Sequence, residues 1–79
     1  MSYEEWLKST EFGLRRRYKV DNIAVDKGGM RVDFINNFHL AINTYALKGL
    51  WESNEVNGDG FSELCKDIER EFMKQIMNF

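Results

Sequence analysis

The chain lacks the residues that usually staple a small protein together. Its 79 residues include no proline, one cysteine and one histidine. Cys65 alone cannot form an internal disulfide, and His39 alone leaves too few ligands for the usual structural zinc sites. A domain this short must therefore rely on a dense apolar core or on a partner. Hydrophobic residues at 43% and aromatic residues at 14% can supply either a core or a contact surface.

An excess of one charge is also missing, because eleven Lys and Arg residues stand against thirteen Asp and Glu, for a net charge of −2. This near balance argues against binding polyanions through bulk charge. No apolar run is long enough to span a bilayer, and the opening MSYEEWLKS is acidic and amphipathic, unlike a signal peptide. Since no linker, repeat or low-complexity tract divides the chain, we expect one cytoplasmic domain over residues 1–79.

The spacing of apolar residues predicts an α+β fold with the order helix, β-hairpin, helix, helix. Ser2 and Glu5 match a capping box at the start of a helix over residues 2–17. Apolar alternation around a glycine-containing turn predicts a hairpin over residues 19–34, which must pack on helices because a lone hairpin is marginal in water. We expect the other helices over residues 36–52, with Asn36 or Asn37 as N-cap, and over residues 60–77.

Phe12 falls on the side of the first helix opposite to its apolar stripe. A break or bend of the helix near Gly13 is the favoured interpretation. The alternative is an exposed Phe12 that waits for a partner.

The helix expected over residues 36–52 would be apolar on two sides, so it needs cover on two sides. One cover is the rest of the domain, and the other could be a second copy of the chain. We therefore predict a homodimer or partner face, to which the last helix adds two methionines. This face consists of Leu40, Leu47, Trp51, Met73 and Met77.

The segment Asn57-Gly58-Asp59-Gly60 resembles part of the calcium loop of the EF-hand family. When the twelve-residue loop of that family is laid from Glu55, Asn57, Asp59 and Glu63 fall on ligand places. The resemblance implies a calcium site at these three residues. The last place holds Lys66 rather than the bidentate glutamate, so we favour a turn in which Asp59 caps the last helix.

The stretch LRRRYK at residues 14–19 is the basic cluster of the chain. Over residues 14–31, six basic residues against Asp21 and Asp26 give a charge of +4. Its arginines could hold phosphates while Tyr18 stacks on a base, or they could meet carboxylates of a protein surface. A solvated helix end that complements the helix dipole is the simplest interpretation. The basic residues are Arg15, Arg16, Arg17, Lys19, Lys27 and Arg31.

No catalytic motif is visible, and Cys65 falls in the apolar stripe of the last helix, as an inert core thiol would. We expect no enzyme and no cofactor. The surplus of aromatic residues instead favours a non-catalytic module that binds a larger protein, and a nucleic-acid-binding regulator that uses residues 15–31 is the alternative. The expected partner-binding residues are Phe12, Arg15, Arg16, Arg17, Tyr18, Arg31 and Trp51, with the end of the chain from Met73 to Phe79 as a further candidate.

In size and layout, the chain is similar to the small stand-alone inhibitors that phages make, including anti-CRISPR proteins. This similarity implies a protein that acts by occluding a surface of a larger protein.

Overall fold

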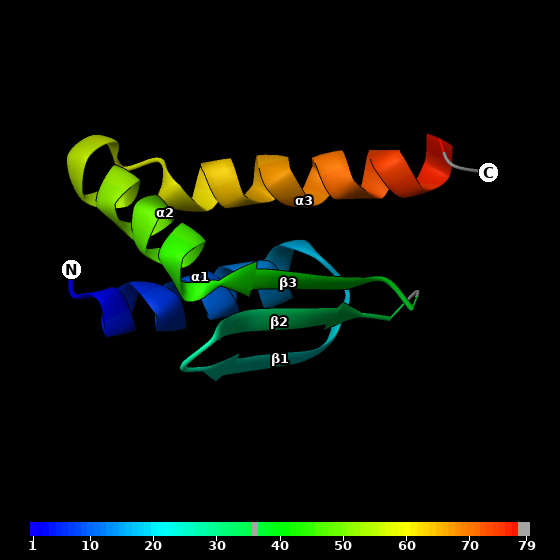
Figure 1. Ribbon diagram of the computed structural model, residues 1–79, viewed down its shortest axis with the longest axis horizontal. Helices are drawn as coiled ribbons and strands as arrows, with labels where there is room; N and C mark the ends of the chain where they lie inside the picture. The colour runs from blue at the N-terminus through cyan, green and yellow to red at the C-terminus, as the bar shows by residue number, and fades with distance from the viewer. Residues whose placement is uncertain (36, 78–79) are drawn as a thin grey trace.

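The computed structural model describes residues 1–35 and 37–77, and for residues 75–77 it describes the backbone alone. Its elements are α1 (Tyr3–Arg17), β1 (Val20–Asp26), β2 (Gly29–Phe34), β3 (His39–Asn43), α2 (Thr44–Asn57) and α3 (Gly60–Met77) (Figure 1). Within the described residues, the expected α+β fold is confirmed. The sheet is larger than the expected hairpin, because it has three antiparallel strands in the order β1-β2-β3.

Helix α1 begins at the capping box that the sequence predicts. Glu5 N donates to Ser2 Oγ at 3.1 Å, and Ser2 N donates to Glu5 Oε1 at 3.3 Å. The helix continues through Gly13 without a break, so the favoured interpretation of a break there is wrong. Gly13 instead leaves room for the ring of Phe61 to pack against α1, since a Cβ added at Gly13 would lie 2.8 Å from Phe61 Cε1. Phe12 is consequently left on the surface, with 64% of it exposed.

The predicted hairpin is present as β1 and β2. Ile23 lies opposite Val32, and a tight turn joins the strands after Asp26. The Asp26 carboxylate holds this turn by accepting from Gly28 N at 2.7 Å and from Gly29 N at 3.2 Å. Carboxylates that accept from nearby amides in this way stabilise turns.

The helix expected over residues 36–52 is wrong in its first part, because His39–Asn43 form β3 and α2 begins only at Thr44. In β3, Leu40 lies opposite Val32 and Ile42 lies opposite Met30. Short apolar segments fit both the helical and the strand period, and here pairing with β2 decides between them by satisfying backbone groups.

The start of α2 is also displaced from its predicted place. Asn43 is the N-cap, and its Oδ1 accepts from Ala46 N at 2.8 Å. Of the two predicted caps, Asn37 lies before β3 with a φ of 67°, and Asn36 lies outside the described residues. An asparagine tolerates such a left-handed conformation better than most residues.

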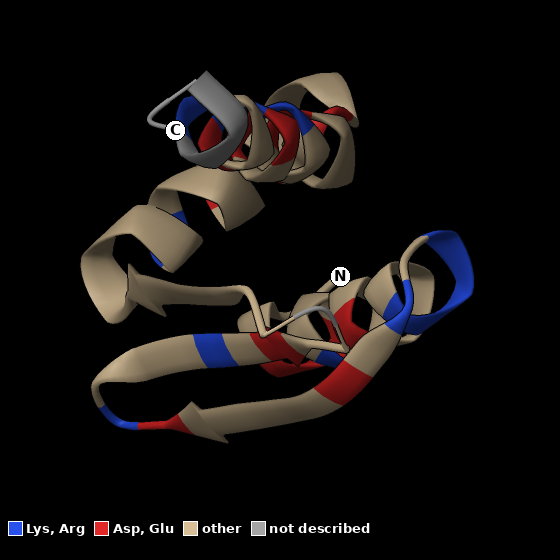
Figure 2. Cartoon of the chain, turned by 90° about the vertical axis from the view of Figure 1, so that its right-hand side faces the viewer, with Lys and Arg blue, Asp and Glu red and all other residues tan. Residues whose placement is uncertain are grey.

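The helices gather on one side of the sheet and beyond one of its edges. Helix α1 lies behind the sheet in Figure 1, and α3 runs along the side formed by β3. Figure 2 shows the same arrangement end-on, with α1 against one face of the sheet and α3 above β3. The opposite face of the sheet has no helix of the described residues over it.

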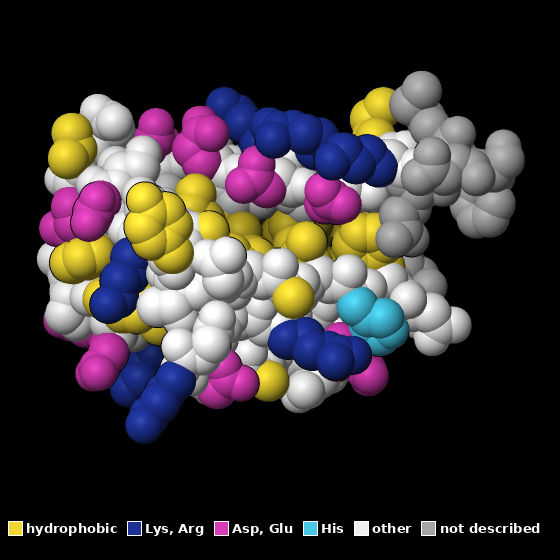
Figure 3. All heavy atoms as spheres, in the orientation of Figure 1, with side chains coloured by type: hydrophobic (Ala, Val, Ile, Leu, Met, Phe, Trp, Pro, Cys, Tyr) yellow, Lys and Arg dark blue, Asp and Glu magenta, His cyan; other side chains and the backbone are white. Residues whose placement is uncertain are grey.

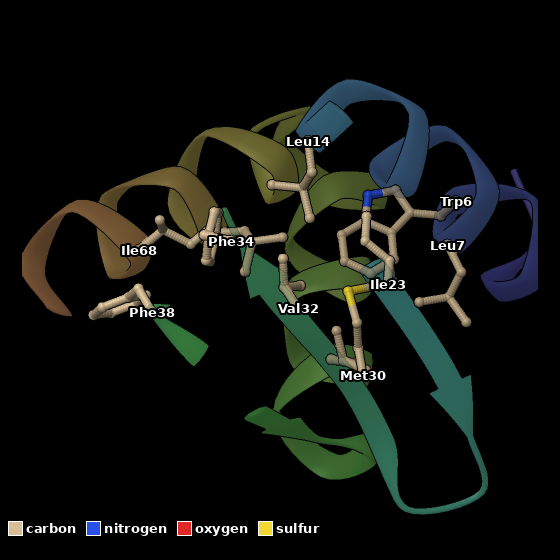
Figure 4. Packing of buried hydrophobic residues seen from close by; sticks show 11 residues of the cluster. Trp6, Leu7, Leu14, Ile23, Met30, Val32, Phe34, Phe38 and Ile68 are labelled. Atoms are coloured by element: carbon tan, nitrogen blue, oxygen red, sulfur yellow. The ribbon is translucent and has the colours of Figure 1, made fainter. Parts of the chain in front are cut away.

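The core lies between α1, the covered face of the sheet and α3 (Figure 4). Phe34, Phe38 and Phe72 meet edge to face near one end of it, with ring centroids 4.6 to 5.6 Å apart. Edge-to-face aromatic pairs add about 0.5–1.5 kcal/mol each to the gain from burial. The buried apolar side chains are Trp6, Leu7, Leu14, Ile23, Met30, Val32, Phe34, Phe38, Leu47, Leu64 and Ile68.

The structure has the favoured helix–helix turn in place of the calcium loop that the EF-hand resemblance implies, because α2 ends at Asn57 and α3 begins at Gly60. Only Gly58 and Asp59 lie between the helices, so a twelve-residue loop has no room. Gly58 ends α2 in the left-handed conformation at φ 73°, and its amide donates to Asn54 O at 2.9 Å. Asp59 does precede α3, and its Oδ1 accepts from Ser53 Oγ at 2.7 Å. The segment therefore works as a tight helix–helix turn.

Candidate functional site

Phe12 and Arg16 form an exposed pair on α1. They are four residues apart, so they lie on the same face of the helix. The Arg16 guanidinium carbon lies 5.7 Å from the centre of the Phe12 ring. Among the described residues, Arg16 has no ion pair. The pair therefore offers an aromatic ring and a free positive charge side by side.

The pair borders a hollow of about 390 Å³ between α1, α2 and the start of α3. Gly13 and Phe61 form part of its floor, and Asn54 of α2 contributes to its wall. Thr10 also lines the hollow, with 2% exposure. Its hydroxyl has no hydrogen-bond partner among the described residues, and an unpaired buried hydroxyl is uncommon in folded proteins. Sequence reasoning missed both Thr10 and the hollow, and the available signal for Thr10 was its helical spacing with the buried Trp6 and Leu14.

The other predicted arginines are engaged within the chain. Arg15 Nη2 lies 3.8 Å from Glu11 Oε1, and Arg17 Nη2 lies 3.1 Å from Glu69 Oε1. Arg31 is on the uncovered face of the sheet, since its neighbours Met30 and Val32 point into the core and strand side chains alternate. The sheet thus separates Arg31 from α1, and the basic residues do not converge on one surface.

Tyr18 fastens the end of α1 to α3. Its hydroxyl donates to Glu69 Oε1 at 3.2 Å, the same oxygen that Arg17 contacts. Its ring meets Phe34 and Phe72 edge to face at 5.9 and 6.0 Å. Burial, with a smaller contribution from Cys65, raises the pKa of Tyr18 to about 12. Tyr18 is therefore committed to the fold rather than free to stack on a base.

The predicted homodimer face is not assembled as expected. Leu47 is completely buried in the core cluster, so its assignment to a contact face is wrong. The reason is that residues 39–43 form β3, so the helix that was expected to be apolar on two sides does not exist. Trp51 is half-buried, and its Nε1 donates to Met1 O at 3.1 Å. Leu40 is half-buried on β3, and Met73 is 60% exposed. The side chain of Met77, like all of Phe79, lies outside the described residues.

The uncovered face of the sheet carries a charged cluster that the sequence did not predict. Asp33 Oδ1 accepts from Arg31 Nε at 2.9 Å and lies 2.7 Å from His39 Nδ1. These side chains belong to neighbouring strands, because Asp33 lies opposite His39. The Arg31 guanidinium first, and His39 second, hold the pKa of the Asp33 carboxyl below its usual range.

Replacement of Arg31 with alanine is expected to raise the pKa of Asp33 toward its ordinary value of about 4. A carboxyl with a lowered pKa in the folded state stabilises the fold above its ordinary pKa. That contribution is lost as the pH falls through the lowered pKa. NMR titration of the Asp33 carboxyl measures the shift, and Arg70→Ala on α3 is the matched control that should leave it unchanged. An equal pKa in wild type and Arg31→Ala would contradict the assignment.

The described residues show neither a metal centre nor a membrane span. No group of three or more His, Cys, Asp or Glu among them could hold a metal ion. Across residues 1–35 and 37–77, no helix has both the length and the apolar character to cross a bilayer. Burial raises the pKa of the Cys65 thiol, which disfavours the reactive thiolate.

In comparisons with known proteins, no family model, no curated protein and no solved structure matches the chain.

Proposed function

We propose that the chain is a non-catalytic protein-binding domain that docks Phe12 and Arg16 on a larger protein and so occludes a surface of that protein. The exposure of Phe12, at 64%, beside an arginine without an ion pair among the described residues is the observation that carries the proposal. Aromatic residues and arginine dominate the energetic centres of protein interfaces. Exposing a phenylalanine costs solubility, and a partner that covers it removes this cost.

The chemistry of the pair describes the partner. The Phe12 ring needs an apolar pocket, and the Arg16 guanidinium suits a carboxylate, to which it can donate two parallel hydrogen bonds. The adjacent hollow can receive a partner side chain. The expected partner surface is therefore an apolar pocket with an Asp or Glu at its rim.

A nucleic-acid-binding regulator is the alternative, and the ion pairs of Arg15, Arg17 and Arg31 weigh against it. Phosphates would have to displace the carboxylates that already hold these arginines.

We favour the cytoplasm as the location, since the lone cysteine suits a reducing compartment. The comparison with phage inhibitors remains one of size and layout.

Replacement of Phe12 with alanine is expected to weaken binding to the partner at least ~30-fold, as loss of an aromatic anchor does. Arg16→Ala is expected to weaken it ~10-fold, mainly through a faster off-rate. The measurement is capture of binding proteins from the native host on the immobilised chain, followed by biosensor titration of the captured protein.

Two matched controls distinguish binding through Phe12 and Arg16 from non-specific binding through any exposed aromatic residue or any arginine. Tyr45→Ala removes an even more exposed aromatic side chain on α2, and Arg15→Ala removes a neighbouring charge on another side of α1. Both should bind as wild type does. A partner that ignores Phe12→Ala and Arg16→Ala would refute the proposal, and so would retention on mixed DNA or RNA with a strong salt dependence.

A further inference from the structure

Helix α2 has an outer face that no part of the described chain covers. Tyr45, Gly49, Glu52 and Val56 follow one another at helical spacing, so they lie in one line along the helix. Tyr45 is 89% exposed and Val56 is 81% exposed, more than any other large apolar side chain of the described residues. Helix α2 stands in the foreground of Figure 1 and at the left of Figure 2, and no element of the described residues lies outside it in either view. These four residues are the α2 face.

Gly49, near the middle of the α2 face, has no packing role within the described chain. Glycine is the least favourable residue for the interior of a helix apart from proline. A Cβ added at Gly49 would meet nothing within 4 Å, so no neighbour requires a glycine there. A missing side chain between two exposed bulky ones leaves a notch at which the backbone of another helix can come close. The α2 face is therefore suited to packing against a helix.

Two opposite charges lie on the same flank of the α2 face. Lys48 and Glu52 are four residues apart and both exposed, and among the described residues neither forms an ion pair. The Lys48 ammonium lies 5.7 Å from the centre of the Tyr3 ring, which holds it at this flank. The opposite flank, with Ala46 and Ser53, is uncharged. The face therefore carries both members of an ion pair that the chain itself leaves unpaired.

We propose that two copies of the chain associate through their α2 faces, with the helices antiparallel about a two-fold axis at the middle of α2. In this register Tyr45 lies opposite Val56 of the second copy, and Gly49 lies opposite Glu52. A two-fold axis perpendicular to the helices sets each flank against the same flank, so Lys48 of either copy meets Glu52 of the other. A parallel pairing would instead set Glu52 against Glu52 and align the helix dipoles. The α2 face is thus complementary to itself in shape and in charge.

This association is separate from the proposed partner binding. Asn54, which contributes to the hollow beside Phe12, is on the opposite side of α2 from Tyr45. Because each copy contributes one helix face, the dimer buries little surface, and we expect a dissociation constant in the micromolar range or above. The chain is then monomeric in dilute unfolding and biosensor experiments. Partner binding and self-association can therefore be lost independently of each other.

Replacement of Tyr45 with alanine is expected to raise the dissociation constant of the dimer at least ~tenfold, because it removes the largest side chain of the face. Gly49→Gln should raise it by a similar factor, because the new side chain fills the notch. Glutamine favours helix over glycine, so this variant should be at least as stable as wild type, and a folding defect cannot explain its effect. Sedimentation over a range of concentrations measures the constant. Phe12→Ala removes an exposed aromatic side chain elsewhere and should associate as wild type does.

An exchange of charges tests the register and shows that the occupant is a second copy. Lys48→Glu alone and Glu52→Lys alone each set like charges against each other, so each should associate at least ~fivefold more weakly than wild type. An equimolar mixture of the two variants restores both ion pairs and should recover most of the wild-type affinity. A strict monomer at millimolar concentration, a Tyr45→Ala or Gly49→Gln variant that dimerises as tightly as wild type, or a mixture that associates no more tightly than the single variants would each overturn the inference.

Discussion

Replacement of Gly29 with alanine is expected to destabilise the protein by about 3 kcal/mol or more, a large share of the stability of a small domain. Gly29 has a φ of 141°, which alanine adopts only at a cost. In addition, an added Cβ would overlap the carbonyl oxygen of Ile42 and lie 2.8 Å from Asn43 Cα. Since both neighbours are backbone atoms of β3, the clash can be relieved only by moving the strand. Urea unfolding followed by tryptophan fluorescence measures the loss.

Gly49 provides the matched control for this substitution. It lies within α2, and an added Cβ would meet nothing within 4 Å. Gly49→Ala should therefore stabilise the protein by up to about 1 kcal/mol, because alanine favours helix. Equal stability of Gly29→Ala and wild type would show that β2 and β3 do not approach each other as closely as described.

Replacement of Leu47 with alanine is expected to cost about 2–5 kcal/mol of stability, the usual effect of a cavity in a core. Leu47 has 0% exposure and belongs to the central apolar cluster. The same urea measurement applies. This result separates a core residue from the contact residue that the sequence predicts, since truncating a contact residue would weaken association and leave the stability of the monomer nearly unchanged.

Tyr45 lies two residues earlier in α2 and is 89% exposed. Tyr45→Ala should change stability by no more than about 0.5 kcal/mol. A stable Leu47→Ala variant with impaired self-association would contradict the structure and restore the predicted contact face.

Local signals explain which elements could be predicted from the sequence. The capping box at Ser2 and Glu5 fixes the start of α1, and the glycine-containing turn after Asp26 fixes the hairpin. Both depend on residues that are close in the sequence. Strand β3 could not be recognised in this way, because residues 38–43 fit a helix as well as a strand and only the edge of β2 decides between them.

The candidate site was predictable in part for the same reason. The helical spacing alone placed Phe12 away from the apolar stripe, and the structure leaves it exposed. The sequence could not single out Arg16 among its neighbours, because Arg17 finds its carboxylate on α3, at Glu69. Which arginine stays unpaired thus depends on tertiary contacts.

The hairpin tip is connected to the start of α2 by two hydrogen bonds. Thr44 N donates to Gly28 O at 3.1 Å, and Thr44 Oγ1 donates to Lys27 O at 2.8 Å. Exposed hairpin tips are usually the safest places to insert a peptide tag or a guest domain. In this protein such an insertion would pull on the first residue of a helix, so protein engineers should look elsewhere for a permissive site.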